Sequence, residues 1–200
     1  MVIRCDIRLA GVGGQGLILA GMILGEAACM FGPYNAVQTP SYAPLVRGAP
    51  SMSEVVISDG PIDFPRVVSV DILLALGPQA CVLHGADVRP GGAIVVESGE
   101  SVRTESVPKI ETNALPVRVY RLPLADTADR CGAPPAAAGL VGLATVARLC
   151  RLVGDEALRR AVSMRVPRDA RASNLTALEA GFRLADACGA TVRDVAAEGR

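Results

Sequence analysis

Residues 11 to 16 read Gly-Val-Gly-Gly-Gln-Gly, directly after the apolar run Ile-Arg-Leu-Ala and before a long helical stretch. A strand that breaks on glycines and continues as a helix leaves backbone N–H groups free at the helix start, where the helix dipole favours an anion. Gly11, Gly13 and Gly16 match the spacing of the dinucleotide fingerprint. We therefore expect this loop to face a ligand or a partner. The open alternative is a loop that only packs a helix tightly on a sheet.

The second feature of the dinucleotide fingerprint, an acidic residue after the second strand, is missing. A dinucleotide fold carries an acidic residue about twenty positions further on, at the end of its second strand, where it holds the ribose hydroxyls. Residues 31–39 contain no Asp, Glu or Arg. NAD or FAD bound in the usual way is therefore disfavoured.

Composition indicates one sizeable globular core. Half of the 200 residues are hydrophobic, a fifth are charged, and the mean hydropathy is +0.37. We expect the excess apolar surface to meet a partner subunit. Lys plus Arg and Asp plus Glu balance at 20 each, and no basic tract stands out, so nucleic acid is not an expected partner.

The six cysteines do not form a metal-binding pattern. They lie at positions 5, 29, 81, 131, 150 and 188, without a C-x-x-C pair and without a histidine at ligand spacing. We expect no zinc or iron–sulfur site in this chain alone. Most of them are expected to be small buried residues in a reducing compartment, the cytoplasm. No apolar run is long enough to cross a membrane, and the first residues do not read as a secretory signal.

Strand-like and helix-like stretches alternate along the chain. Strands are expected over residues 3–9, 34–38, 52–58, 71–76, 93–96 and 117–122, and helices over 16–30, 78–84, 140–152, 155–162 and 174–187. Gly154 suits the end of one helix and Asp155 the start of the next. This alternation predicts an α/β fold of one domain, with a Rossmann-like open, largely parallel sheet flanked by helices.

A proline-rich segment, residues 40–50, joins the second and third expected strands. Its prolines stiffen it, and Ser41, Tyr42 and Arg47 offer directed polar groups. We expect a rigid lip beside the glycine loop, with Arg47 pairing to a phosphate or a carboxylate. The alternative is a solvated loop whose Arg47 pairs with a nearby acidic side chain.

No catalytic set can be read from the sequence. His84, the only histidine, is expected at a helix end as a surface or capping residue. Glu54 lies inside an apolar strand, and simple alternation directs it to solvent or to a partner. We expect no catalytic residue in this chain.

Several motifs together carry a family resemblance. They are the loop from Gly11 to Gly16 with its apolar helix, Pro40-Ser-Tyr-Ala-Pro-Leu-Val-Arg-Gly, Ser53-Glu-Val-Val-Ile-Ser, Pro90-Gly-Gly-Ala-Ile-Val-Val, and Asn174-Leu-Thr-Ala-Leu-Glu-Ala-Gly. The chain resembles the gamma subunit of 2-oxoacid:ferredoxin oxidoreductases. Ser53-Glu54 and Ile62-Asp63-Phe64-Pro65 are most similar to the 2-oxoglutarate type. The resemblance implies a pyruvate/ketoisovalerate oxidoreductase gamma-type domain over residues 1–190 and a C-terminal tail over 191–200.

Two motifs depart from the family pattern. Gly48-Ala49 stands where two glycines are usual, and Ala138-Gly139-Leu140-Val141 stands where an Asn-Met pair is usual. These departures bear on the choice of oxoacid and on the contacts made by the loops.

The resemblance implies a shared reaction. A 2-oxoacid is decarboxylated on thiamine diphosphate held by alpha and beta subunits, and the acyl group passes to coenzyme A. Electrons pass through iron–sulfur clusters on beta or on a ferredoxin-like subunit to ferredoxin. The gamma part would flank the approach of coenzyme A, with these candidate contacts: Gly11, Gly13, Gly14, Gln15, Gly16, Ser41, Tyr42, Arg47 and Gly48. The alternatives are a stand-alone NAD-type oxidoreductase domain and a purely structural subunit.

Overall fold

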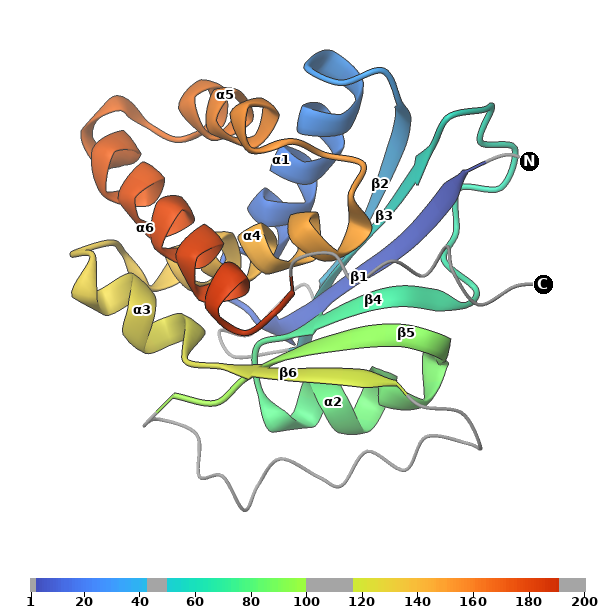
Figure 1. The fold of residues 1–200 in the computed structure, drawn as a ribbon, viewed down its shortest axis with the longest axis horizontal. Coiled ribbons are helices and arrows are strands. Elements are labelled where there is room, and N and C mark those ends of the chain that lie inside the picture. The colour runs from blue at the N-terminus through green and yellow to red at the C-terminus, as the bar shows by residue number, and fades with distance from the viewer. Residues whose placement is uncertain (1–2, 43–49, 100–116, 191–200) are drawn as a thin grey trace.

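A six-stranded sheet in the order β2-β3-β1-β4-β5-β6 forms the centre of the computed structural model, which describes residues 3–42, 50–99 and 117–190 (Figure 1). The strands are β1 (Arg4–Val12), β2 (Asn35–Tyr42), β3 (Pro50–Ser58), β4 (Val70–Ala75), β5 (Val88–Glu97) and β6 (Arg118–Leu122). The helices are α1 (Leu17–Met30), α2 (Pro78–His84), α3 (Leu124–Arg130), α4 (Ala138–Cys150), α5 (Asp155–Arg165) and α6 (Arg168–Ala187). Short 3₁₀ turns, η1 (Gly85–Asp87) and η3 (Pro135–Ala137), precede β5 and α4.

Among the strands of the described residues, β3 alone runs against the others. It pairs antiparallel with β1 on one side and with β2 on the other, whereas β1, β4, β5 and β6 are parallel neighbours. The predicted single-domain α/β fold with an open, largely parallel sheet is therefore confirmed. The predicted tail, residues 191–200, lies outside the described residues.

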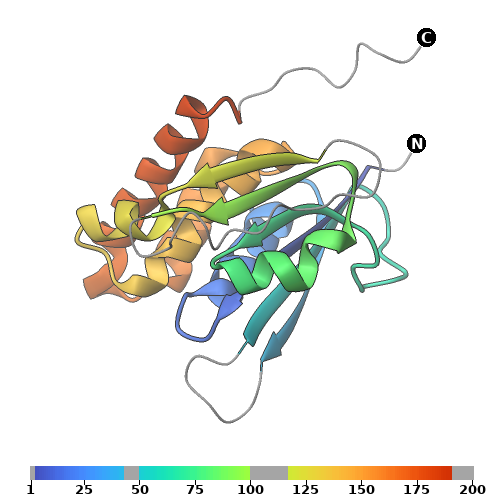
Figure 2. The same cartoon turned by 90° about the horizontal axis from the view of Figure 1, so that it is seen from below.

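Helices cover the two faces of the sheet unequally. One face carries α1, α4, α5 and α6, while α2 lies on the other face against β4 and β5 (Figures 1 and 2). The helix after β1 and the helix after β4 thus leave the sheet on opposite faces. In an open α/β sheet such a switch between neighbouring strands creates a crevice at their carboxyl ends, where ligands usually bind.

The first helix is buried on more than one side, because it packs on β2 and β3 as well as on α4 and α5. Small residues permit this close packing. A Cβ atom added at Gly21 would lie 2.1 Å from the Ser53 Oγ atom of β3. The absence of a side chain at Gly21 therefore allows α1 to lie close against β3.

Several elements differ from the sequence prediction, among them β5, which begins at Val88 rather than at residue 93. The strand β2 continues through Pro40 to Tyr42, which was expected to be loop; as an edge strand it can hold a proline whose missing N–H faces away from the sheet. Helix α3 was not expected, and α6 begins at Arg168, six residues earlier than expected. Gly154 precedes α5 in an extended conformation, while Arg151, with φ 58°, ends α4.

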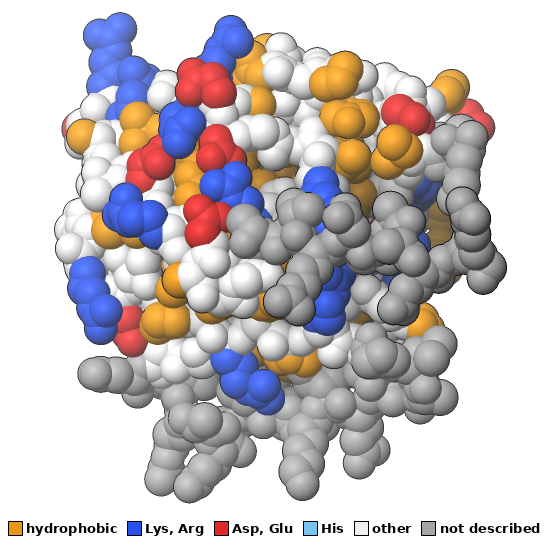
Figure 3. Space-filling view, in the orientation of Figure 1, with side chains coloured by type: hydrophobic (Ala, Val, Ile, Leu, Met, Phe, Trp, Pro, Cys, Tyr) orange, Lys and Arg blue, Asp and Glu red, His pale blue; other side chains and the backbone are white. Residues whose placement is uncertain are grey.

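Ion pairs join helices on the face of the sheet that carries α1, α4, α5 and α6. Arg148 of α4 pairs with Asp155 of α5 and Asp186 of α6, and its guanidinium lies 4.7 Å from the centre of the Phe182 ring. Figure 3 shows side chains of both charges mixed over α5 and α6, at the upper left. These pairs are partly exposed, so each contributes little to stability.

The cysteines are less buried than expected. Cys5 and Cys81 are buried, but Cys29 and Cys188 are exposed and the other two are intermediate. The prediction that most are buried is therefore wrong, because helix ends rather than core positions hold several of them. Within the described segments, no helix has the length and apolar character needed to span a bilayer.

Candidate functional site

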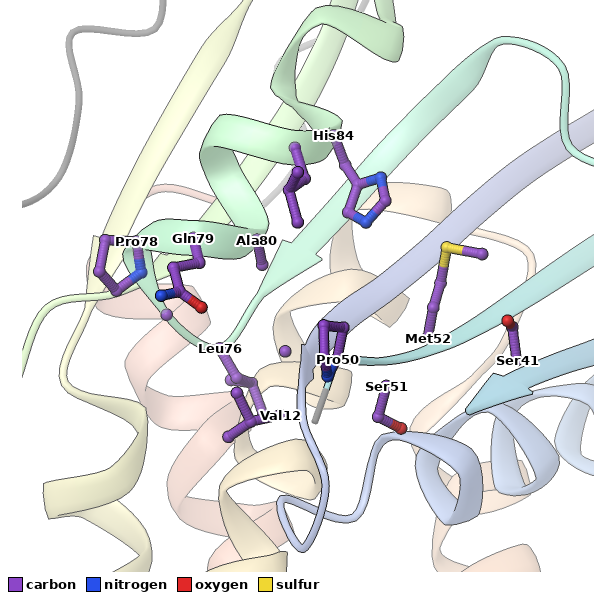
Figure 4. Close-up of a pocket in the computed structure, with 13 residues that line it drawn as sticks. Val12, Ser41, Pro50, Ser51, Met52, Leu76, Pro78, Gln79, Ala80 and His84 are labelled. Carbon is purple, nitrogen blue, oxygen red and sulfur yellow. The ribbon is translucent and has the colours of Figure 1, made fainter. Parts of the chain in front are cut away.

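A cavity of about 540 Å³ opens at the carboxyl ends of β1 and β4, on the α2 side of the sheet (Figure 4). Its wall combines residues from the β1 end, the β2–β3 hairpin and the first turn of α2, among them Val12, Ser51, Leu76 and Gln79. The wall is mainly apolar with a few polar groups. This composition is typical of small-molecule sites.

Two smaller hollows adjoin this cavity. One of about 290 Å³ lies at the start of α1 and shares Val12 and Ser51 with the larger cavity. Another of about 230 Å³ shares Leu76 with the large cavity and Gln15 with the hollow at α1. The glycine loop therefore lies at the junction of all three, where an elongated ligand could contact more than one of them.

The glycines of the loop have different roles. Gly13 and Gly14 are exposed, and Gly14, with φ 97°, has open space where a Cβ atom would lie. Gly16, with φ 75°, faces the chain itself: its Cβ atom would lie 2.2 Å from the Ala136 carbonyl oxygen in η3. Gly13 and Gly14 therefore expose their backbone, whereas Gly16 allows two segments of the chain to approach closely.

The side chain of Gln15 binds backbone groups on two strands. Its Oε1 atom accepts a hydrogen bond from the Val12 N–H (2.8 Å), and its Nε2 atom donates to the Leu76 carbonyl (2.9 Å). A Cβ atom at Gly11 would lie 2.3 Å from the same Oε1 atom. Gln15 thus lies at the predicted site, but its polar atoms are used within the chain.

The structure describes only some of the contact residues that were predicted on the β2–β3 hairpin. Ser41 is exposed on β2 and lines the large cavity, and Tyr42 is the last residue of that strand. Arg47 and Gly48 lie outside the described residues. Gly11 and Ser41 therefore line the same cavity at one edge of the sheet.

A chain of charged side chains extends from the sheet to η1, the turn that follows α2. Arg8 donates to Glu54 through Nε (3.0 Å) and Nη2 (2.7 Å), and its Nη1 atom bonds to Asp87. The side chains of Arg8 and Glu54 are 9% and 6% exposed. The prediction that Glu54 faces solvent or a partner is therefore wrong. The two residues are direct cross-strand neighbours on the α2 face, and alternation alone did not reveal that the opposite strand carries a matching charge.

His84 is the last residue of α2. Its side chain lines the cavity, on the same side of the cavity as Met52 (Figure 4). Its Nδ1 atom lies 3.9 Å from Asp87. Burial, together with the nearby Arg8 charge, lowers the pKa of His84, although Asp87 and Glu54 act in the opposite direction. The imidazole is therefore neutral near pH 7, and its side chain is only 24% exposed rather than free on the surface.

Two further groups near the site are occupied by structural roles. Glu97, at the end of β5, accepts the backbone N–H groups of Gly99 (2.6 Å) and Ala125 (2.7 Å) and so holds the start of α3. Burial raises the pKa of Cys81 to about 11, which leaves no reactive thiolate there. Across the described segments, no three His, Cys, Asp or Glu side chains gather as metal ligands do.

Sequence reasoning missed the α2 side of the site. Leu76, Gln79 and Ala80 line the cavity, but they belong to a short, ordinary-looking strand–helix turn. The available signal was Gly77-Pro78 directly after a buried strand, since such a turn at a second strand end marks the other wall of a crevice.

A family model described as pyruvate ferredoxin/flavodoxin oxidoreductase matches residues 6–184. The chain belongs to this family. It is 41% identical over 182 residues to the 2-oxoglutarate synthase subunit KorC of Methanocaldococcus jannaschii, covering 91% of this chain and 94% of that subunit. The corresponding subunit of Methanothermobacter thermautotrophicus is 39% identical, with 91% and 95% covered.

Solved structures agree with this family assignment. The gamma subunit of a keto/oxoacid ferredoxin oxidoreductase from Geobacter sulfurreducens superposes with a TM-score of 0.78 at 37% identity, covering 93% of this chain and 98% of that one. A 2-oxoglutarate:ferredoxin oxidoreductase from Magnetococcus marinus shares the fold, with a TM-score of 0.75 at 22% identity, and 92% of this chain spans 31% of that one. The resemblance to gamma subunits is confirmed.

The fold of this chain also differs from the dinucleotide fold in the position of its second strand. In the classic order 3-2-1-4-5-6 the second strand lies beside the first. Here antiparallel β3 separates β1 from β2. The edge that would hold a nucleotide ribose is therefore built differently, which weighs against the NAD alternative.

Proposed function

We propose that this chain is the gamma component of a 2-oxoglutarate:ferredoxin oxidoreductase that acts in the cytoplasm. The observation that carries the proposal is similarity along almost the whole length of KorC subunits, 41% over 91% of this chain. A shared domain alone would leave part of those relatives unmatched, whereas 94% of that subunit is covered. The reaction would convert 2-oxoglutarate and coenzyme A to succinyl-CoA and carbon dioxide while ferredoxin is reduced.

The chemistry would be divided between subunits. Alpha and beta subunits would bind thiamine diphosphate, and beta or a ferredoxin-like subunit would hold the iron–sulfur clusters. The exposed apolar side chains on α2, Val82 (66% exposed) and Leu83 (61%), support a partner surface beside the cavity. This chain would complete the assembly and form one wall of the path to the thiamine.

Coenzyme A would approach through the crevice at the glycine loop. The exposed backbone of Gly13 and Gly14, the start of α1 and the hydroxyl of Ser41 are available to it on one edge of the sheet. The Magnetococcus marinus enzyme, which shares the fold, is described with 2-oxoglutarate, coenzyme A and succinyl-CoA bound. We further assign Tyr42, Arg47 and Gly48 to this contact, with the Arg47 guanidinium pairing to a phosphate.

Reconstitution tests the proposal. The purified chain, its alpha and beta partners, and their mixture would each be assayed for reduction of ferredoxin or a viologen dye with 2-oxoglutarate and coenzyme A. We expect no turnover from this chain alone and coenzyme A-dependent turnover from the full mixture. Turnover by the purified chain alone would overturn the proposal, as would equal rates with and without it.

A further inference from the structure

The parallel pairing of β1 with β4 is interrupted at its carboxyl end. The two strands pair from Ile7 and Ile72 to Ala10 and Ala75, and the Leu76 N–H still donates to the Ala10 carbonyl (2.8 Å). In a parallel ladder a residue that donates to position 10 accepts from position 12. The next rung would therefore join the Val12 N–H directly to the Leu76 carbonyl.

The carboxamide of Gln15 occupies this rung. It accepts from the Val12 N–H at 2.8 Å and donates to the Leu76 carbonyl at 2.9 Å, so two hydrogen bonds and one amide group stand where neighbouring rungs have a single bond. Both backbone groups are thus satisfied through the carboxamide rather than by each other. This carboxamide bridge joins β1 and β4, the strands whose following helices lie on opposite faces of the sheet.

Gly11 makes room for this arrangement. It follows Ala10, the last β1 residue paired with β4, and a Cβ atom at Gly11 would lie 2.3 Å from Gln15 Oε1 and 3.1 Å from Leu76 Cβ. Any side chain at this position would expel the carboxamide or push Leu76 away. The first glycine of the loop is thus explained by the Gln15 side chain as well as by the turn.

We propose that Gln15 is a positioning residue that holds the carboxyl ends of β1 and β4 apart and thereby keeps the crevice beside the glycine loop open. Val12 and Leu76, the two residues it joins, both line the cavity of about 540 Å³. The effect on coenzyme A rests on the proposed function, whereas the effect on the strands does not. Direct pairing of the Val12 N–H with the Leu76 carbonyl would narrow the crevice but would leave the exposed residues of the site in place.

Substitutions separate the two hydrogen bonds. Gln15→Ala removes the spacer and allows the Val12 N–H to pair directly with the Leu76 carbonyl. Gln15→Glu keeps the length and the acceptor, but an ionised carboxylate cannot donate to the Leu76 carbonyl and repels it. A protonated carboxyl can both accept and donate. At acid pH the Gln15→Glu side chain should therefore again make the hydrogen bonds to the Val12 N–H and the Leu76 carbonyl. Asn35→Ala is a matched control, because it removes a side-chain amide bond to a backbone carbonyl (Gly60, 3.0 Å) at the opposite end of the sheet.

Three measurements on the full chain test the positioning role. In wild-type protein, nuclear magnetic resonance should show the Gln15 carboxamide protons exchanging at least tenfold more slowly than those of exposed Gln79, with a coupling across the bond to Leu76. The stability deficit of Gln15→Glu relative to wild type should shrink as pH falls toward 4. In the assembled complex, Gln15→Ala should raise the apparent KM for coenzyme A tenfold or more, with the KM for 2-oxoglutarate changed less than twofold and Asn35→Ala unchanged in both.

The outcomes are distinguishable from those of the proposed function. Rapid exchange of the Gln15 carboxamide, or a deficit of Gln15→Glu that is independent of pH, would overturn the positioning role even if no variant assembles. A folded Gln15→Ala chain with an unchanged KM for coenzyme A would overturn its link to the crevice. A wild-type complex that does not use coenzyme A would instead contradict the proposed function and leave the exchange and pH results to decide the role of Gln15.

Discussion

Gly14 and Gly16 share a left-handed backbone, with φ values of 97° and 75°, but only Gly16 lies against another segment. Gly16→Ala should therefore destabilise the chain by more than about 2 kcal/mol, through the left-handed backbone and the contact with the Ala136 carbonyl. Gly14→Ala, the control, should cost only about 1 kcal/mol. Urea unfolding of both variants measures the difference. Equal losses would show that Ala136 can move away freely.

His84 should make stability depend on pH. Burial and Arg8 lower its folded pKa below the ordinary value of 6.5, so the unfolded chain takes up a proton first as pH falls. The stabilising contribution is therefore complete above about pH 6.5 and is lost as pH falls through the folded pKa. Wild type should lose stability relative to His84→Gln between pH 8 and 5. A pH-independent difference between the two proteins would contradict this assignment.

At the scale of single residues, the sequence located the glycine loop better than the contacts that its side chains make. The glycine spacing correctly located a loop at a strand–helix junction. It did not show that Gln15 bonds to Val12 and Leu76, because the Leu76 carbonyl is 61 positions away in sequence. The prediction for Glu54 was wrong for the same reason, because its partner Arg8 lies on another strand.

At the scale of elements, β1 and β3 are joined by a buried ion pair. Arg8→Met should cost about 3–5 kcal/mol, because it leaves the Glu54 carboxylate buried without its partner. The double variant Arg8→Met with Glu54→Met should recover more than half of that loss, since Asp87 is 46% exposed and can be solvated. A double-mutant cycle by chemical unfolding measures this coupling. Additive losses would mean that the pair contributes no coupling energy.

Element types were easier to predict than element ends. Long apolar runs such as α1 and β4 were placed within a residue or two. The end of β2 was missed, because a proline normally argues against a strand and only the edge position of β2 permits one. The charged first turns of α6 were missed because its apolar face begins only near Asn174.

At the scale of the whole molecule, the order of the strands could not be read from the sequence. Alternating elements predict a largely parallel sheet, but β3 inserts antiparallel between β1 and β2 through a hairpin of sequential strands. This insertion brings Ser41 and Ser51 to the same edge as the glycine loop. The crevice that we assign to coenzyme A is thus a property of the assembled sheet, and no single motif contains it.

Hydrogen exchange on the assembled complex tests that assignment most directly. With coenzyme A added, backbone amides of the glycine loop and of residues 50–52 and 77–84 should exchange more slowly, whereas 2-oxoglutarate alone should leave them unchanged. The Asn35 end of the sheet serves as the internal control in the same data. Protection confined to the partner subunits, with none on these segments, would contradict the account.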